Sequence, residues 1–92
     1  MRQVVYTVEI PSNFVSDFKE KYVEYMNEYV NDFFVGTKVR GYSFELKEEN
    51  VYTIWVDTEK RLNQGSTQMI NYRTNGFYSG YCAAKGIGNV KA

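Results

Sequence analysis

The chain has 92 residues, eleven acidic and eleven basic side chains, no histidine and one cysteine. This length predicts a single domain, and a lone cysteine excludes a disulfide within the chain. The absence of histidine removes the commonest general base and zinc ligand, so we expect no catalytic site, no metal and no cofactor. Nine tyrosines, six phenylalanines and one tryptophan instead supply large rings, which suit a small core or a binding surface.

The charges are unevenly distributed along the chain. Residues 1–36 have a net charge of −3, residues 37–64 are neutral, and residues 65–92 have a net charge of +3. A neutral total is atypical of proteins that bind nucleic acid through its phosphates. No stretch has the pattern of a secretory leader or a membrane span, so we expect a cytoplasmic protein without membrane contact. If a phage encodes the chain, we expect the protein in the cytoplasm of the host cell.

The first predicted element is a β-strand over residues 3–10. Apolar and polar side chains alternate there, and Pro11 ends the strand because proline cannot donate to the sheet. The residues predicted to share its apolar face are Val4, Tyr6, Val8 and Ile10.

A long amphipathic helix is predicted from Ser12 to Val35, with Gly36 as its C-terminal cap. Its apolar arc covers about 200° of the helix, against about 100° for an ordinary core-facing stripe. Such an arc predicts a second covered surface: a partner, a second subunit, or more of the same chain. A shorter helix ending near Met26, followed by a strand over residues 29–35, is the alternative. The residues expected to face the sheet are Phe14, Val15, Phe18 and Phe33, with Tyr22 and Tyr29 nearby.

Residues 39–47 and 51–57 are predicted to form two antiparallel strands joined at residues 48–50. Val51, Thr53 and Trp55 give the second strand a second apolar face. That pattern predicts either an internal strand or a sheet face covered by another molecule.

The C-terminal third allows two interpretations. Residues 67–74 form a short helix, or residues 68–73 form a strand that Asn75-Gly76 connects to another strand over residues 77–82. We favour the helix, because it completes a ferredoxin-like βαββαβ order; the alternative is βαββ plus a C-terminal β-hairpin. Either way we predict an α+β fold, a single antiparallel sheet with one long helix on one face. Residues 1–85 form the domain and residues 86–92 a flexible tail.

The favoured functional hypothesis is a small non-catalytic protein-binding module. Inhibitors and regulators encoded by phages and mobile elements are of this kind, and we expect a homodimer. Aromatic residues and methionine are enriched at protein contacts. The predicted interface residues are Val23, Tyr25, Met26, Val30, Phe34 and Trp55.

Two other hypotheses remain. The first is a nucleic-acid role, because Tyr42 and Phe44 alternate on one strand as base-stacking aromatics do. The predicted contacts are Arg40, Tyr42, Phe44 and Arg73. Alternatively, an acidic helix face could mimic nucleic-acid phosphates through Asp17, Glu20, Glu24 and Glu28. The second is a dimeric α+β barrel that binds a ligand or acts as an enzyme in a cavity between helix and sheet.

Overall fold

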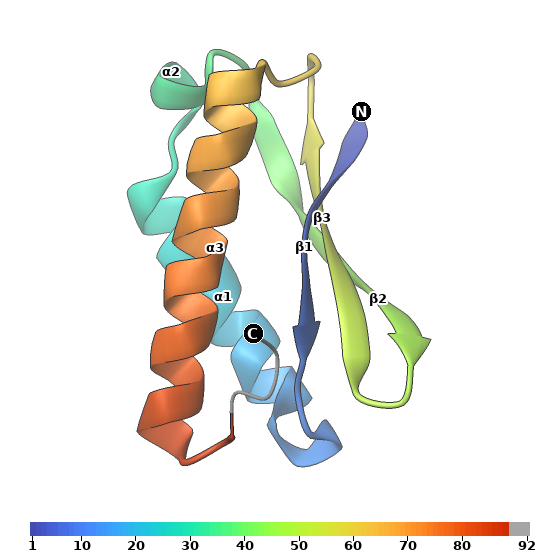
Figure 1. Cartoon of the computed structure of the whole chain (residues 1–92). Coiled ribbons are helices and arrows are strands. Elements are labelled where there is room, and N and C mark those ends of the chain that lie inside the picture. Colours follow the sequence, from blue (N-terminus) through green and yellow to red (C-terminus); the bar gives the residue numbers. More distant parts are fainter. Residues whose placement is uncertain (89–92) are drawn as a thin grey trace.

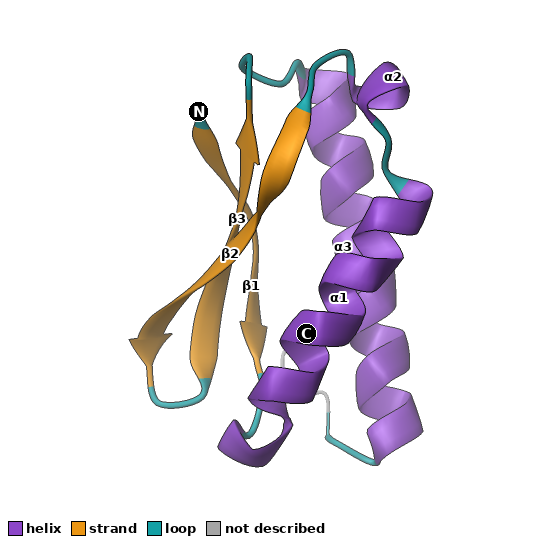
Figure 2. Cartoon of the chain, turned by 180° about the vertical axis from the view of Figure 1, so that it is seen from behind, coloured by secondary structure: helices purple, strands orange, loops and turns teal. Residues whose placement is uncertain are grey.

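A computed structural model describes residues 1–88 as a sheet covered on one face by helices (Figures 1 and 2). The fold is α+β with one antiparallel sheet, as predicted. Among the described residues, no helix combines the length and apolar character that crossing a bilayer requires. The elements in chain order are β1 (Arg2–Glu9), a 3-10 turn (Ser12–Phe14), α1 (Val15–Tyr29), α2 (Asp32–Val35), β2 (Val39–Glu48), β3 (Val51–Thr58) and α3 (Gln64–Lys85).

The three strands are antiparallel in the order β1-β3-β2, so β3 is the internal strand. Its two apolar faces had predicted either this position or a sheet face covered by another molecule. A β-bulge between Val4 and Tyr6 interrupts the alternation of β1. Val4 therefore pairs with Trp55 on the face away from the helices, whereas Val5 is buried and Tyr6 contacts α3. The prediction that Val4 shares a face with Tyr6 is wrong for this reason.

The predicted helix over residues 12–35 is divided. Val30 and Asn31 have extended backbones and separate α1 from α2. The Asn31 side chain accepts a hydrogen bond from the Phe34 N–H at 3.0 Å and so caps α2. Gly36 ends α2 with a φ of 78°, as predicted. The break turns Phe33 into solvent, where it is 90% exposed, so its predicted place in the core is wrong.

The C-terminal third forms one helix, α3, rather than a short helix and a strand. Asn63 caps its start by accepting from the Ser66 N–H at 2.7 Å, and Gly86 ends it in a left-handed conformation. Asn75-Gly76, predicted as a turn in the alternative topology, lies within the helix. The described residues therefore contain three strands, and neither the βαββαβ order nor the C-terminal hairpin is found. Of the predicted tail, Gly86 and Ile87 complete the helix cap, and residues 89–92 lie outside the described part.

The core lies where α1 meets both the sheet and α3. The Phe18 and Tyr22 rings of α1 lie 6.0 and 5.6 Å from Phe44 of β2, measured between centroids. The same two rings lie 5.4 and 5.8 Å from Phe77 of α3. The wide apolar arc of α1 is thus covered from two directions by the same chain.

Two tyrosines of this core, whose hydroxyl groups are both buried, should respond differently to loss of the hydroxyl. The Tyr22 hydroxyl shares a 2.7 Å hydrogen bond with Thr74, whereas the Tyr42 hydroxyl is buried without a hydrogen-bond partner among the described residues. Tyr22→Phe should lower the free energy of unfolding by about 1–2 kcal/mol, because it leaves the Thr74 hydroxyl unpaired. Adding Thr74→Val should recover most of this loss, and Tyr42→Phe should cost nothing. Urea denaturation measures all three; equal losses for the two Tyr→Phe variants would contradict the assignment.

The stability of the fold should also fall at alkaline pH. Burial raises the pKa of Tyr42 from 10.0 to about 12, so the folded chain holds this proton more tightly than the unfolded chain. This contribution to stability is complete below pH 10 and is lost as the pH rises from 10 to about 12. Burial also raises the pKa of Tyr22 and of Tyr81. In denaturant titrations across this range, Tyr42→Phe should lose less stability than the wild type; parallel curves would show that Tyr42 does not contribute.

Candidate protein-interaction surface

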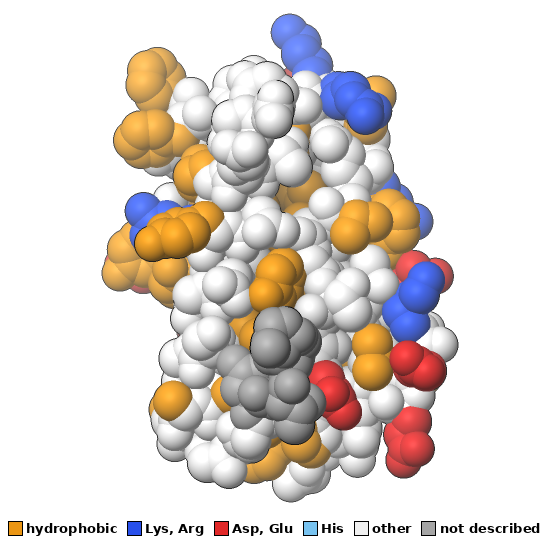
Figure 3. All heavy atoms as spheres, in the orientation of Figure 1, with side chains coloured by type: hydrophobic (Ala, Val, Ile, Leu, Met, Phe, Trp, Pro, Cys, Tyr) orange, Lys and Arg blue, Asp and Glu red, His pale blue; other side chains and the backbone are white. Residues whose placement is uncertain are grey.

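Two adjacent phenylalanines project into solvent from α2. Phe33 is 90% exposed and Phe34 is 69% exposed, and we call this pair the aromatic corner. Figure 3 shows hydrophobic side chains gathered over α2 at the upper left of the molecule. Exposed phenylalanines side by side are informative, because such rings are ordinarily placed in a core.

The aromatic corner is held by hydrogen bonds on both sides of α2. The Asp32 carboxylate accepts from the Val39 N–H at 2.9 Å, and the Val35 carbonyl accepts from the Ser66 hydroxyl of α3 at 3.1 Å. A helix of one turn is not stable alone, so these tertiary bonds and the two caps hold its backbone. The two rings are therefore displayed from a fixed support.

Further rings lead from the core to the surface on the same flank of the molecule. Tyr25 lies 5.1 Å from Phe77 and 4.8 Å from Tyr29, measured between ring centroids. Tyr29 is 45% exposed, and the Arg73 guanidinium of α3 lies 5.4 Å from its ring centroid. A cation above an aromatic ring is a stabilising arrangement that is also frequent at protein interfaces.

The outer face of α3 carries almost no charge. Between Gln64 and Ala84 the only charged residue is Arg73. In Figure 3 the spheres over α3 are mostly white and orange, whereas red ones gather over the sheet side. Protein surfaces that face only water ordinarily mix both signs of charge. The exposed residues of this neutral face include Gln68, Tyr72, Asn75, Gly76, Ser79, Gly80, Ala83 and Ala84.

Two glycines lie in the middle of this face without a packing reason inside the chain. A Cβ atom added to Gly76 or Gly80 would meet nothing within 4 Å. Glycine within a helix destabilises it by roughly 0.5–1 kcal/mol relative to alanine. These positions therefore leave a smooth strip on which another molecule can approach the backbone closely.

A shallow groove of about 510 Å³ borders this face between α3 and β1. The Tyr6 hydroxyl donates to the Asn75 side-chain oxygen at 2.7 Å, and the Asn71 amide donates to the Val5 carbonyl at 2.6 Å. Tyr72, 79% exposed, lines the groove. The residues that line it are all uncharged, as on the outer face of α3.

The predicted interface residues are dispersed. Phe34 belongs to the aromatic corner, Tyr25 and Val23 are partly buried, and Trp55 lies on the open face of the sheet. Met26 and Val30 are 0% and 5% exposed, because α3 and the sheet cover the edge of α1 that was expected to face a partner. These two residues are core residues rather than surface ones.

The predicted nucleic-acid residues do not gather either. The Tyr42 and Phe44 rings face the helices, 5.5 and 5.6 Å from the Tyr22 ring, so they are not available to stack on bases. Arg40 lies on β2, and Arg73 lies on α3 over Tyr29.

One residue of the acidic face joins the two long helices. Asp17 accepts a hydrogen bond from the Tyr81 hydroxyl of α3 at 2.7 Å and pairs with Lys21 at 3.0 Å. These contacts lower the pKa of Asp17, with the Tyr81 bond the larger cause. Glu20, Glu24 and Glu28 are exposed on α1.

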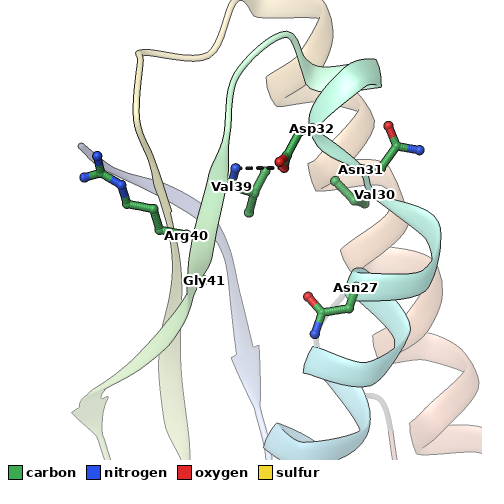
Figure 4. A pocket seen from close by; sticks show the side chains of 7 residues that line it. All are labelled: Asn27, Val30, Asn31, Asp32, Val39, Arg40 and Gly41. Atoms are coloured by element: carbon green, nitrogen blue, oxygen red, sulfur yellow. Dashed lines mark hydrogen bonds between the residues drawn. The ribbon is translucent and has the colours of Figure 1, made fainter.

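The hollow at the end of α1 and the buried cysteine show no sign of a reactive site. A hollow of about 330 Å³ lies between the end of α1 and β2, where the Asp32 carboxylate already bonds the Val39 N–H and Arg40 points to the opposite side of the strand (Figure 4). Cys82 is buried, and burial raises the pKa of its thiol, which disfavours the reactive thiolate.

Phe33 and the neutral face of α3 were not among the interface residues that the sequence predicted. The sequence contained a signal for this face, because residues 64–84 include a single charged residue, which is few for a helix. The buried residues 66, 70, 74 and 78 are spaced four apart, as residues on one face of a helix are. Comparisons with protein-family models, with curated proteins and with solved structures each find no match to this chain.

Proposed function

We propose that the chain is a small non-catalytic protein-binding module that binds its partner through the aromatic corner and the neutral outer face of α3. The observation that carries this proposal is the pair Phe33 and Phe34, exposed by 90% and 69% on a capped and anchored turn. Burial of one phenylalanine side chain in a partner is worth about 1.5–3 kcal/mol. The fixed support reduces the ordering cost on binding.

The composition of the α3 face supports the same function. Tyrosine, serine, glycine and asparagine dominate antibody paratopes, because tyrosine gives large contacts at low entropy cost while the small polar residues adapt their hydrogen bonds. Tyr72, Asn75, Ser79 and Gly80 present this set of side chains on one exposed helix face. Binding of this kind needs no chemistry, so the module would act as an inhibitor or regulator by occupying a surface of its partner.

The proposal is tested with two surface variants and a matched control. Phe33→Ser with Phe34→Ser removes the corner, and Gly80→Arg places charge and bulk in the centre of the α3 face. Gly80→Ala is the control, since it adds only a methyl group to an open position and should stabilise the helix by about 0.5–1 kcal/mol. We expect a partner captured from the native cells by the wild type and by Gly80→Ala to be lost with both surface variants.

Thermal unfolding of all four proteins checks that the surface variants still fold. Because the substituted side chains are exposed, their midpoints should not fall below that of the wild type by more than a few degrees. Quantitative mass spectrometry of the captured proteins is the measurement. Identical captured proteins for the wild type and both folded surface variants would refute this surface as the binding site.

A further inference from the structure

The open face of the sheet carries a fixed aromatic platform at its centre. Both long helices cover the opposite face (Figures 1 and 2), so Val4 is 51% exposed beside its cross-strand neighbour Trp55. The Arg2 guanidinium lies 4.2 Å from the centroid of the Trp55 ring, and the Trp55 indole N–H donates to the Glu45 carboxylate at 3.0 Å. Tryptophan and arginine are the residues most enriched at the energetic centres of protein interfaces.

The charges on this face are separated along the strands. At one end, Arg2 and Arg40 surround Asp57, whose carboxylate is already paired with the amino group of Met1 at 2.9 Å. A hollow of about 210 Å³ lies between these two arginines. The Met1 amino group, Arg40 and Arg2 all lower the pKa of Asp57, in agreement with a positive surrounding.

The opposite end of the face has more acidic than basic side chains, with three glutamates and Lys47 at the bulge of β2 beside Glu48. Glu9 and Glu48 both pair in register with Val51 of the central strand, and Glu45 lies one row inward beside Thr53. From the basic end to the acidic end, the four cross-strand rows are Arg2-Asp57-Gly41, Val4-Trp55-Ser43, Thr7-Thr53-Glu45 and Glu9-Val51-Glu48.

This order is complementary to itself. Consider two copies stacked with their open faces together and related by a two-fold axis that lies between the sheets, perpendicular to the strands. This axis keeps each strand opposite the same strand of the copy and reverses the order of the rows, so the first row meets the fourth row of the other copy. Arg2 then lies opposite Glu9 of the copy. Arg40, the bulge residue beside Gly41 of the first row, lies opposite Glu48. Between them the row of Trp55 meets the row of Thr53, in which Thr53 is buried and the small Thr7 beside it is exposed, and each of these contacts occurs twice by symmetry.

We propose that a second copy of this chain occupies the open face of the sheet, in a two-fold dimer with Trp55 at its centre and Arg2 and Arg40 bound to the acidic end of the other copy. A second copy is the occupant because the order of charges along this face is complementary to the same order reversed. The dimer leaves the aromatic corner and α3 on its two outer sides, so it does not depend on the proposed function. A face three strands wide is small, and we expect a micromolar rather than a nanomolar dissociation constant.

Charge-swapped variants test this dimer in solution. One variant carries Arg2→Glu and Arg40→Glu, and the other carries Glu9→Arg and Glu48→Arg. Each variant alone places like charges in contact, so sedimentation equilibrium should show a dissociation constant raised at least about tenfold. Mixing the two variants should restore a heterodimer, because both contact pairs are again of opposite charge, and native mass spectrometry distinguishes it by mass.

A matched control places the charge change of the second variant on the helical side, as Glu24→Arg with Glu28→Arg on the exposed side of α1, and should leave the dimer unchanged. If a swapped variant does not fold, the salt dependence of the wild-type dimer decides, because charge pairs at an interface rim weaken as salt is added. A wild-type chain that stays monomeric, folded variants that do not recover on mixing, or a dimer insensitive to salt would each overturn the proposal. Loss of the dimer with partner capture intact would leave the proposed function standing.

Discussion

The packing of Tyr22 at the junction of the sheet and both long helices is the constraint on which the rest of the structure depends. Its side chain is fully buried, its ring contacts Phe44 of β2 and Phe77 of α3, and its hydroxyl bonds Thr74 of α3. Separating the two helices would leave the buried hydroxyls of Tyr22 and Thr74 both unpaired, at a cost in free energy, so this bond sets the position of α3 along α1. The Asp17–Tyr81 hydrogen bond joins the same two helices nearer the C-terminal end of α3.

The placement of α3 in turn decides what the surface offers. Because α3 covers the far edge of α1, the wide apolar arc of α1 is used inside the chain and leaves no broad apolar surface on that helix. The exposed rings are instead concentrated where α1 ends, at the break of Val30 and Asn31 that starts α2. The aromatic corner and the outer face of α3 thus present a neutral and aromatic surface, while the open sheet face carries separated charges around Trp55. The two sides suit different partners because their chemistry differs.

The elements that the sequence predicted well were those with one dominant periodicity. The two strands of the β2–β3 hairpin alternate clearly, and β3 carries apolar residues on both faces because neighbours flank it on both edges. The predictions were wrong where one sequence pattern is compatible with two local structures. Asn75-Gly76 is typical of a hairpin turn, but α3 tolerates it because Tyr78 and Ile70, on either side, are anchored in the core. The bulge at Val5 was not predictable, since it changes the face of Val4 without changing the composition of the strand.

The sequence by itself determined the α+β class, the antiparallel hairpin, the left-handed cap at Gly36 and an apolar arc on α1 too wide for one neighbour. These features follow from local periodicity, backbone preferences and side-chain size, which act within a few residues. Only the tertiary structure decided that α3 is the second neighbour, that Met26 and Val30 are therefore buried, and that Phe33 and Phe34 are exposed. Those outcomes depend on contacts between residues far apart in the chain, such as Tyr22 with Thr74 and Val35 with Ser66, which no local pattern encodes.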